Sequence, residues 1–154
     1  MSAPALVPLL LLWPLLALMA VGDMRRLRIP NALCLAGLAL FVFCLPLLAP
    51  SEIAWRLLGA GLVFCAGFAL FAAGIVAGGD VKALSVLVLF VPSAAWLVYA
   101  QVFAVSLLAG IALVALAQRL PGAEASGWAM RRERGAMPMG LSIALSGLML
   151  PLIG

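Results

Sequence analysis

Two long apolar stretches without a single charged residue dominate the middle of the chain, from Leu57 to Ala77 and from Ala83 to Gln118. A bilayer accommodates such stretches as helices, because about 20 apolar residues cross its core and a helix satisfies its own backbone hydrogen bonds. Of all 154 residues, 68% are hydrophobic and only 9% are charged, which excludes a soluble domain. The sequence therefore predicts an all-α, polytopic membrane protein with a single transmembrane domain.

The charge-free segments predict a bundle of six transmembrane helices, at about residues 3–22, 31–48, 57–76, 81–91, 95–117 and 139–153. Pro50-Ser51-Glu52 is expected to form a polar turn, and Pro92-Ser93 divides the second long stretch. The start, Met1 to Ala20, lacks the positively charged region of a signal peptide and is expected to be a retained first span.

Lysine and arginine predict the orientation. With six spans, one side of the membrane holds only Arg56, and the other side holds Arg25, Arg26, Arg28, Lys82, Arg119, Arg131, Arg132 and Arg134. Because positive loops stay in the cytoplasm, both termini are predicted outside and both Asp23 and Asp80 at the cytoplasmic face. Basic residues at membrane boundaries indicate contact with the lipid bilayer and not with nucleic acid. The arginines between residues 131 and 134 are interpreted as topology anchors.

Two acids stand out against this background. Asp80 lies within Gly78-Gly79-Asp80-Val81-Lys82, between the two apolar stretches, and Asp23 follows the first span. A charged residue near the bilayer centre costs about 2.5–3.5 kcal/mol on insertion scales, so such residues are usually functional. Each acid also has a structural interpretation: Asp80 as the N-cap of the fourth helix, and Asp23 as a solvated loop residue compensated by Arg25 and Arg26.

Two neighbouring carboxyls share a proton, so that one serves as a base and the other as an acid. Such a pair can activate water toward a peptide carbonyl without metal or histidine. The chain has no histidine, which excludes a Ser-His-Asp triad and a histidine-based metal site, and no metal or cofactor is expected. Cys34, Cys44 and Cys65 show no CxxC spacing and are interpreted as small apolar residues.

Three motifs carry a resemblance to a known family. Asp23 followed after six residues by Pro30-Asn31 resembles the first active-site motif of the type IV prepilin peptidases, which are GxGD aspartyl membrane peptidases. Gly78-Gly79-Asp80-Val81-Lys82 resembles the second motif, and Pro138-Met139-Gly140 resembles the closing Pro-aromatic-Gly segment. The likeness is greatest to the short branch that serves tight-adherence (Flp) pili.

The resemblance implies that Asp23 and Asp80 are the catalytic pair of an aspartic endopeptidase in the bacterial inner membrane. It implies cleavage of the leader of type IVb or Flp prepilins after a glycine, at the cytoplasmic face. It also implies an active-site support role for Gly78, Gly79, Lys82, Pro30 and Asn31, and a substrate groove near Pro138 and Gly140. The chain has no cysteine-tetrad domain, so peptidase activity is expected without N-methylation.

Departures from the pattern leave alternatives open. Ala77 replaces the first motif glycine, Met139 the usual aromatic residue and Leu141 a common proline. The competing functions are a small proton-coupled transporter and an inactive pilus-assembly factor. The sequence does not define the oligomeric state.

Among the individual residues, Lys82 either reaches the headgroups or tunes the acids, and Asn31 either bonds near Asp23 or merely begins a helix. Glu52 is interpreted as a solvated loop residue. The small pairs Gly74 with Gly78 and Gly140 with Ala144 are interpreted as helix-packing faces.

Overall fold

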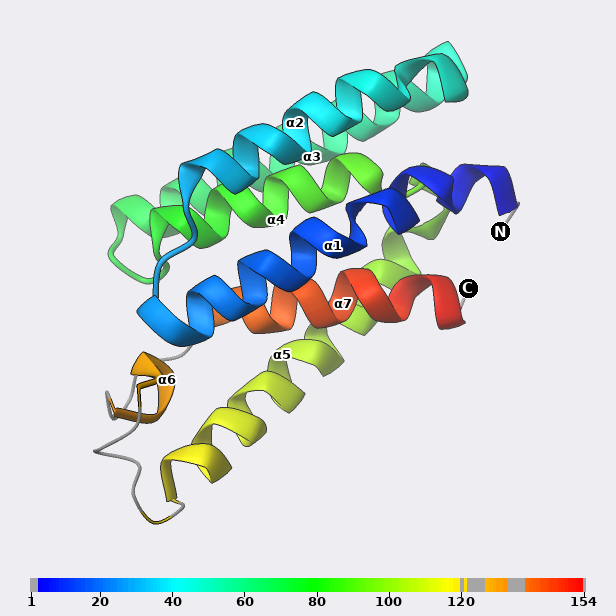
Figure 1. Ribbon diagram of the computed structural model, residues 1–154. Coiled ribbons are helices and arrows are strands. Elements are labelled where there is room, and N and C mark those ends of the chain that lie inside the picture. Colours follow the sequence, from blue (N-terminus) through cyan, green and yellow to red (C-terminus); the bar gives the residue numbers. More distant parts are fainter. Residues whose placement is uncertain (1–2, 120, 122–126, 133–137, 154) are drawn as a thin grey trace.

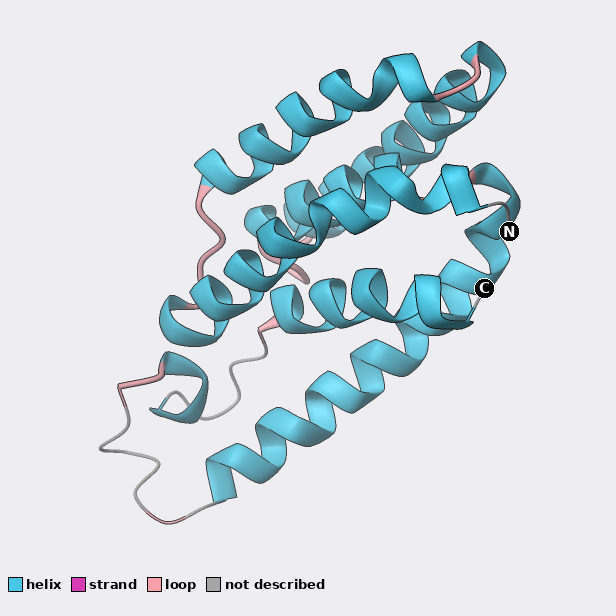
Figure 2. Cartoon of the chain, turned by 45° about the vertical axis from the view of Figure 1, so that its right-hand side comes forward, coloured by secondary structure: helices cyan, strands magenta, loops and turns pink. Residues whose placement is uncertain are grey.

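The computed structural model describes residues 3–119, 121, 127–132 and 138–153, and every regular element in these ranges is helical (Figures 1 and 2). In chain order, the elements are α1 (Ala3–Arg26), α2 (Asn31–Cys44), η1 (Leu45–Leu47), α3 (Pro50–Ala72), α4 (Gly78–Phe90), η2 (Ser93–Ala95), α5 (Trp96–Arg119), α6 (Ala129–Arg132) and α7 (Met139–Ile153). The two η elements are single 3₁₀ turns. The all-α fold class is therefore confirmed.

Six of these helices, α1 to α5 and α7, correspond in order to the six segments predicted from hydropathy. The predicted turn at Pro92-Ser93 is confirmed, since α4 ends at Phe90 and the chain re-forms a helical turn at Ser93. Within the part of the chain that the structure describes, three regions are long and apolar enough to cross a membrane: Leu6–Arg26, Pro50–Ala72 and Ser93–Arg119. The number of crossings and the orientation of the termini stay predictions.

The third helix begins seven residues earlier than the predicted segment and ends four residues sooner. Pro50 is not part of a polar turn but the first residue of α3, where its missing N–H does no harm. At the other end, Gly74 adopts a φ of +74° and its N–H donates to the carbonyl of Phe71, while the N–H of Ile75 donates to that of Leu70. This pattern is a Schellman motif, which ends a helix at a left-handed glycine.

Gly74 is consequently not a packing residue. A Cβ added at Gly74 would meet nothing within 4 Å, so the predicted packing face with Gly78 is wrong. The second predicted pair differs from Gly74 and Gly78. Gly140 and Ala144 are both buried on α7, and Gly140 contacts α1.

The core surrounds α4, a short helix that contacts α1, α2, α3 and α7. Eight of its residues are buried, among them Leu87 and Phe90 with no exposed surface. Leu12 and Leu16 of α1 and Ile143 of α7 also belong to this core. A helix that is apolar on all sides is stable only when other helices or lipid surround it.

The outer helices present large apolar side chains at the surface. Phe43 on α2 is 79% exposed and Leu97 on α5 is 74% exposed. A continuous apolar exterior of this kind is compatible with lipid and not with water. In the bundle, the N- and C-termini lie at one end, and the end of α1 and the starts of α4 and α7 lie at the other (Figure 1).

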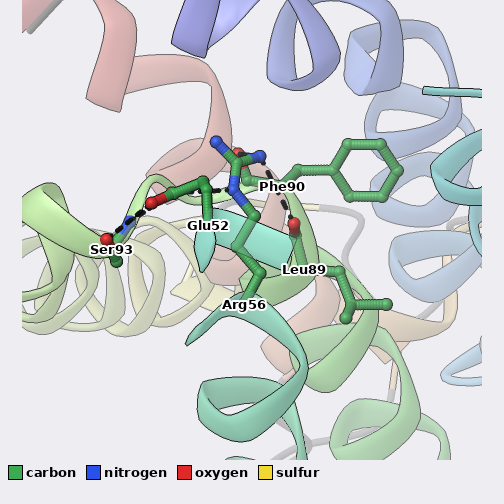
Figure 3. A network of polar contacts seen from close by, with 5 residues as sticks. All are labelled: Glu52, Arg56, Leu89, Phe90 and Ser93. Atoms are coloured by element: carbon green, nitrogen blue, oxygen red, sulfur yellow. Dashed lines mark hydrogen bonds and ion pairs between the residues drawn. The ribbon is translucent and has the colours of Figure 1, made fainter. Parts of the chain in front are cut away.

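A polar network joins α3 to the end of α4 and the start of η2 (Figure 3). Arg56 has no exposed surface, and its Nε donates to Oε1 of Glu52 at 3.0 Å while its Nη1 donates to the carbonyl of Phe90 at 3.2 Å. Glu52 also accepts from the backbone N–H and the hydroxyl of Ser93, at 2.8 and 2.7 Å. The prediction that Glu52 is a solvated loop residue is wrong, because its carboxylate is occupied by these donors within the first turn of α3.

Candidate active site

The end of the bundle opposite the termini brings together the last turn of α1 and the first turns of α4 and α7 (Figures 1 and 2). Between α1 and α2 the chain reverses at Leu27, whose φ of 51° is in the left-handed region. Its N–H donates to the carbonyl of Asp23, and Ile29 then packs as a buried side chain against Gly79 of α4. The linker that follows Asp23 thereby packs against the first turn of α4, which carries Asp80.

Asp23 lies in the last turn of α1 and is only 4% exposed. Its Oδ2 accepts a hydrogen bond from the backbone N–H of Gly140 at 2.8 Å. The interpretation of Asp23 as a solvated loop residue is therefore wrong. The carbonyl end of α1 disfavours a negative charge, but the N-terminus of α7 faces this carboxylate and favours one.

Asp80 is the third residue of α4, outside the three regions able to span a membrane. The N-cap of α4 is Ala77, so the interpretation of Asp80 as the capping residue is wrong. Burial, followed by the negative charge of Asp23, raises the pKa of Asp80 to about 7. The negative charge of Asp23 therefore opposes ionisation of Asp80.

Lys82 and Asn31 form a contact beside the acids. The Nζ of Lys82 donates to Oδ1 of Asn31 at 3.1 Å, which links the first turn of α4 to the first turn of α2. Both side chains line an apolar cavity of about 540 Å³ between α2, α3 and α4, together with Cys34, Phe64 and other apolar residues. A cavity of this size suits an apolar ligand segment with a polar contact at one end.

The remaining predicted residues lie around this site. Pro30 is the extended residue directly before α2, and Pro138 is buried directly before α7. Gly78 and Gly79 are the first two residues of α4. A Cβ at Gly78 would lie 3.3 Å from the ring of Phe71, whereas one at Gly79 would make ordinary contacts with Ile29.

A second polar cluster holds α6 against the ends of α1 and α5. The guanidinium of Arg25 lies 5.0 Å from the ring centroid of Trp128, a cation–π distance. Arg131 donates to the carbonyls of Ala117 and Pro121, and the amide of Gln118 donates to the carbonyl of Met130 at 2.8 Å. Arg131 therefore binds the carbonyl end of α5, while Arg134 lies outside the described residues.

Sequence reasoning missed two features of this molecule. Glu52 and Arg56 are four residues apart, a spacing that predicts a contact on one helix face, but nothing in the sequence indicated Ser93 as their partner. Gly140 was predicted in a substrate groove, and its hydrogen bond to a residue 117 positions away has no local signal.

A bundle of apolar helices with two interacting acids at one end defines a membrane-embedded protein with an acidic site. The chain belongs to the type IV leader peptidase family, whose model matches residues 9–116, more than half of its length. The match includes both acids and ends before α7. Neither the search of curated proteins nor the search of solved structures gave a significant match.

Proposed function

We propose that this protein is an aspartic endopeptidase that hydrolyses the leader-peptide bond of type IVb or Flp prepilins, at the cytoplasmic face of the bacterial inner membrane and without N-methylation. The observation that carries the proposal is the interaction of Asp23 with Asp80, because a carboxyl pair that shares one proton supplies both a base and an acid near neutral pH. Membership of a peptidase family supports the same conclusion.

In the proposed reaction, the ionised carboxylate takes a proton from water as the water oxygen bonds to the carbonyl carbon. The protonated carboxyl gives its proton to the carbonyl oxygen, and a neutral tetrahedral diol forms. Proton transfer to the nitrogen then breaks the C–N bond, releasing a new carboxyl terminus and a new amine. The cavity beside Lys82 and Asn31 is a suitable site for the first apolar side chains after the cleaved bond.

The direct test is cleavage by the purified protein in liposomes. The substrate is a synthetic precursor with a basic leader, a terminal leader glycine and an apolar helix. Mass spectrometry is expected to show two fragments and, with S-adenosylmethionine present, an unmethylated new N-terminus. Intact precursor would contradict the proposal and favour an assembly factor, and proton-driven solute uptake by the same liposomes would favour a transporter.

The interaction of Asp23 with Asp80 predicts that the rate of precursor cleavage falls at high pH. Above about pH 7, Asp80 loses the proton that the reaction needs, so the cleavage rate is expected to fall by about tenfold per pH unit. The measurement is the single-turnover rate at saturating precursor from pH 5 to 9, with precursor binding measured at each pH as the control. A rate that continues to rise through pH 9 would contradict the assignment of Asp80 as the acid.

The bond between Lys82 and Asn31 predicts a smaller effect. Lys82→Met and Asn31→Ala are each expected to lower the cleavage rate by about two- to tenfold, as for loss of one hydrogen bond that positions α4. The double variant should lose no more than either single variant, because both remove the same contact. Arg119→Met, which removes an exposed charge from the end of α5, is the control, and additive losses would show that the two side chains act separately.

A further inference from the structure

The acidic site includes a close contact between the backbone of Gly140 and the side chain of Asp23. The N–H of Gly140 is among the first N–H groups of α7, which have no partner within their own helix. It donates instead to Oδ2 of a carboxylate that is 4% exposed. A hydrogen bond to an ionised acceptor is about twice as strong as a neutral one, and low local dielectric strengthens it further.

Only glycine permits this contact. A Cβ at residue 140 would lie 2.8 Å from Oδ2, 2.9 Å from Cβ and 3.1 Å from Cγ of Asp23. Two of these atoms belong to the base of a short side chain on a helix, which cannot swing aside as the end of a long side chain can. Gly147, on the same helix, differs in this respect, because its nearest neighbours are the methyl ends of Leu16 and Leu87.

We propose that the backbone N–H of Gly140 is a positioning group that makes Asp23 the ionised partner of the acid pair and leaves the shared proton on Asp80. The proposal rests on the proposed peptidase function and adds the roles: Asp23 is the base that activates water, and Asp80 is the acid. The N–H and the positive end of α7 both stabilise a charge on Asp23, which the carbonyl end of α1 alone would oppose.

Other charges at this end of the bundle are the same in the protein and in every Gly140 and Gly147 variant compared below. Within the described residues they are Asp80 and Lys82 on α4, Arg25 and Arg26 on α1, Arg28 in the linker, Arg119 on α5, and Arg131 and Arg132 on α6. A difference between these variants therefore reports the N–H group itself.

The test replaces Gly140 by glycolic acid in cell-free synthesis, which turns the amide into an ester and removes the N–H without adding a side chain. The cleavage rate at neutral pH is expected to fall by about tenfold to a hundredfold, with the acid limb of the pH–rate profile displaced upward by about one pH unit. The matched control is glycolic acid at Gly147, which removes an N–H from the interior of α7 and is expected to leave the profile unchanged.

A second readout does not depend on activity. In an Asp80→Asn background, infrared titration of ¹³C-labelled aspartate follows the protonation of Asp23 alone. The ester at residue 140 is expected to move its midpoint upward by about one pH unit, and an unmoved midpoint would overturn the proposal even if cleavage were lost.

Side-chain variants test the steric part of the proposal. Gly140→Ala is expected to lose at least tenfold in rate, and Gly147→Ala to stay within about threefold of the wild type. Equal losses at equal thermal stability would show that residue 140 acts only through packing. If the unmodified protein did not cleave the precursor, the peptidase proposal itself would fail, whereas normal cleavage by the ester protein would remove only the role of Gly140.

Discussion

Asp23→Asn and Asp80→Asn are each expected to lower the rate of leader cleavage by about 10²–10⁴-fold, the contribution of a general acid or base. Asparagine has nearly the shape of aspartate but neither takes nor gives a proton at the required step. In Asp23→Asn the side-chain amide oxygen can still accept the N–H of Gly140, so the fold is expected to persist. The measurement is the single-turnover rate with the synthetic precursor in liposomes.

The double variant separates a working pair from two independent groups. Residues that act as a unit are non-additive, so Asp23→Asn with Asp80→Asn should lose no more than the more severe single variant. Helical circular dichroism and the thermal midpoint in detergent are the controls for folding. Full cleavage by both single variants would show that the acids do not carry the reaction.

The helices that sequence predicted well are those fixed by composition. Hydropathy placed the six main helices in order, and Pro92-Ser93 marked a turn because proline cannot continue the preceding helix. The acids were identifiable for a similar reason, since a charge among apolar residues stands out in any reading of the chain. Both kinds of signal are local.

The features that sequence did not predict depend on contacts between distant segments. Glu52 beside Pro50 has the local signature of a solvated turn, and only the packing of α3 on α4 brings Ser93 to its carboxylate. Gly74 and Gly78 have the spacing of a packing face, but Gly74 ends α3. The bond from Gly140 to Asp23 likewise requires α7 to lie against α1, which no local pattern specifies.

Glu52→Ala is expected to be strongly destabilising, by about 3–5 kcal/mol. Arg56 is fully buried, and this variant removes the carboxylate that balances its charge. Arg56 also serves the end of α4, where its Nη1 contacts the carbonyls of Leu89 and Phe90 that no helical N–H can satisfy. The loss should therefore loosen α3, α4 and η2 together.

Removing the buried charge itself has a different consequence. Arg56→Met replaces the guanidinium by an apolar side chain, and Glu52 keeps its two bonds from Ser93, so this variant should be less damaging than Glu52→Ala. Glu52→Gln combined with Arg56→Met removes both charges and is expected to lie within about 1.5 kcal/mol of the wild type, because replacing a whole buried pair is often nearly neutral. The measurement is reversible unfolding in mixed micelles.

The order of these variants distinguishes a charge effect from a packing effect. If packing alone held this end of the bundle, the double variant would be at least as unstable as either single one. Because the network is at the end of α4 whereas Asp80 lies in the first turn of that helix, cleavage per folded molecule is expected to change by less than about threefold in all of them. A large loss of activity in folded Glu52→Ala protein would show instead that the position of α4 at one end controls its first turn, and with it Asp80, at the other.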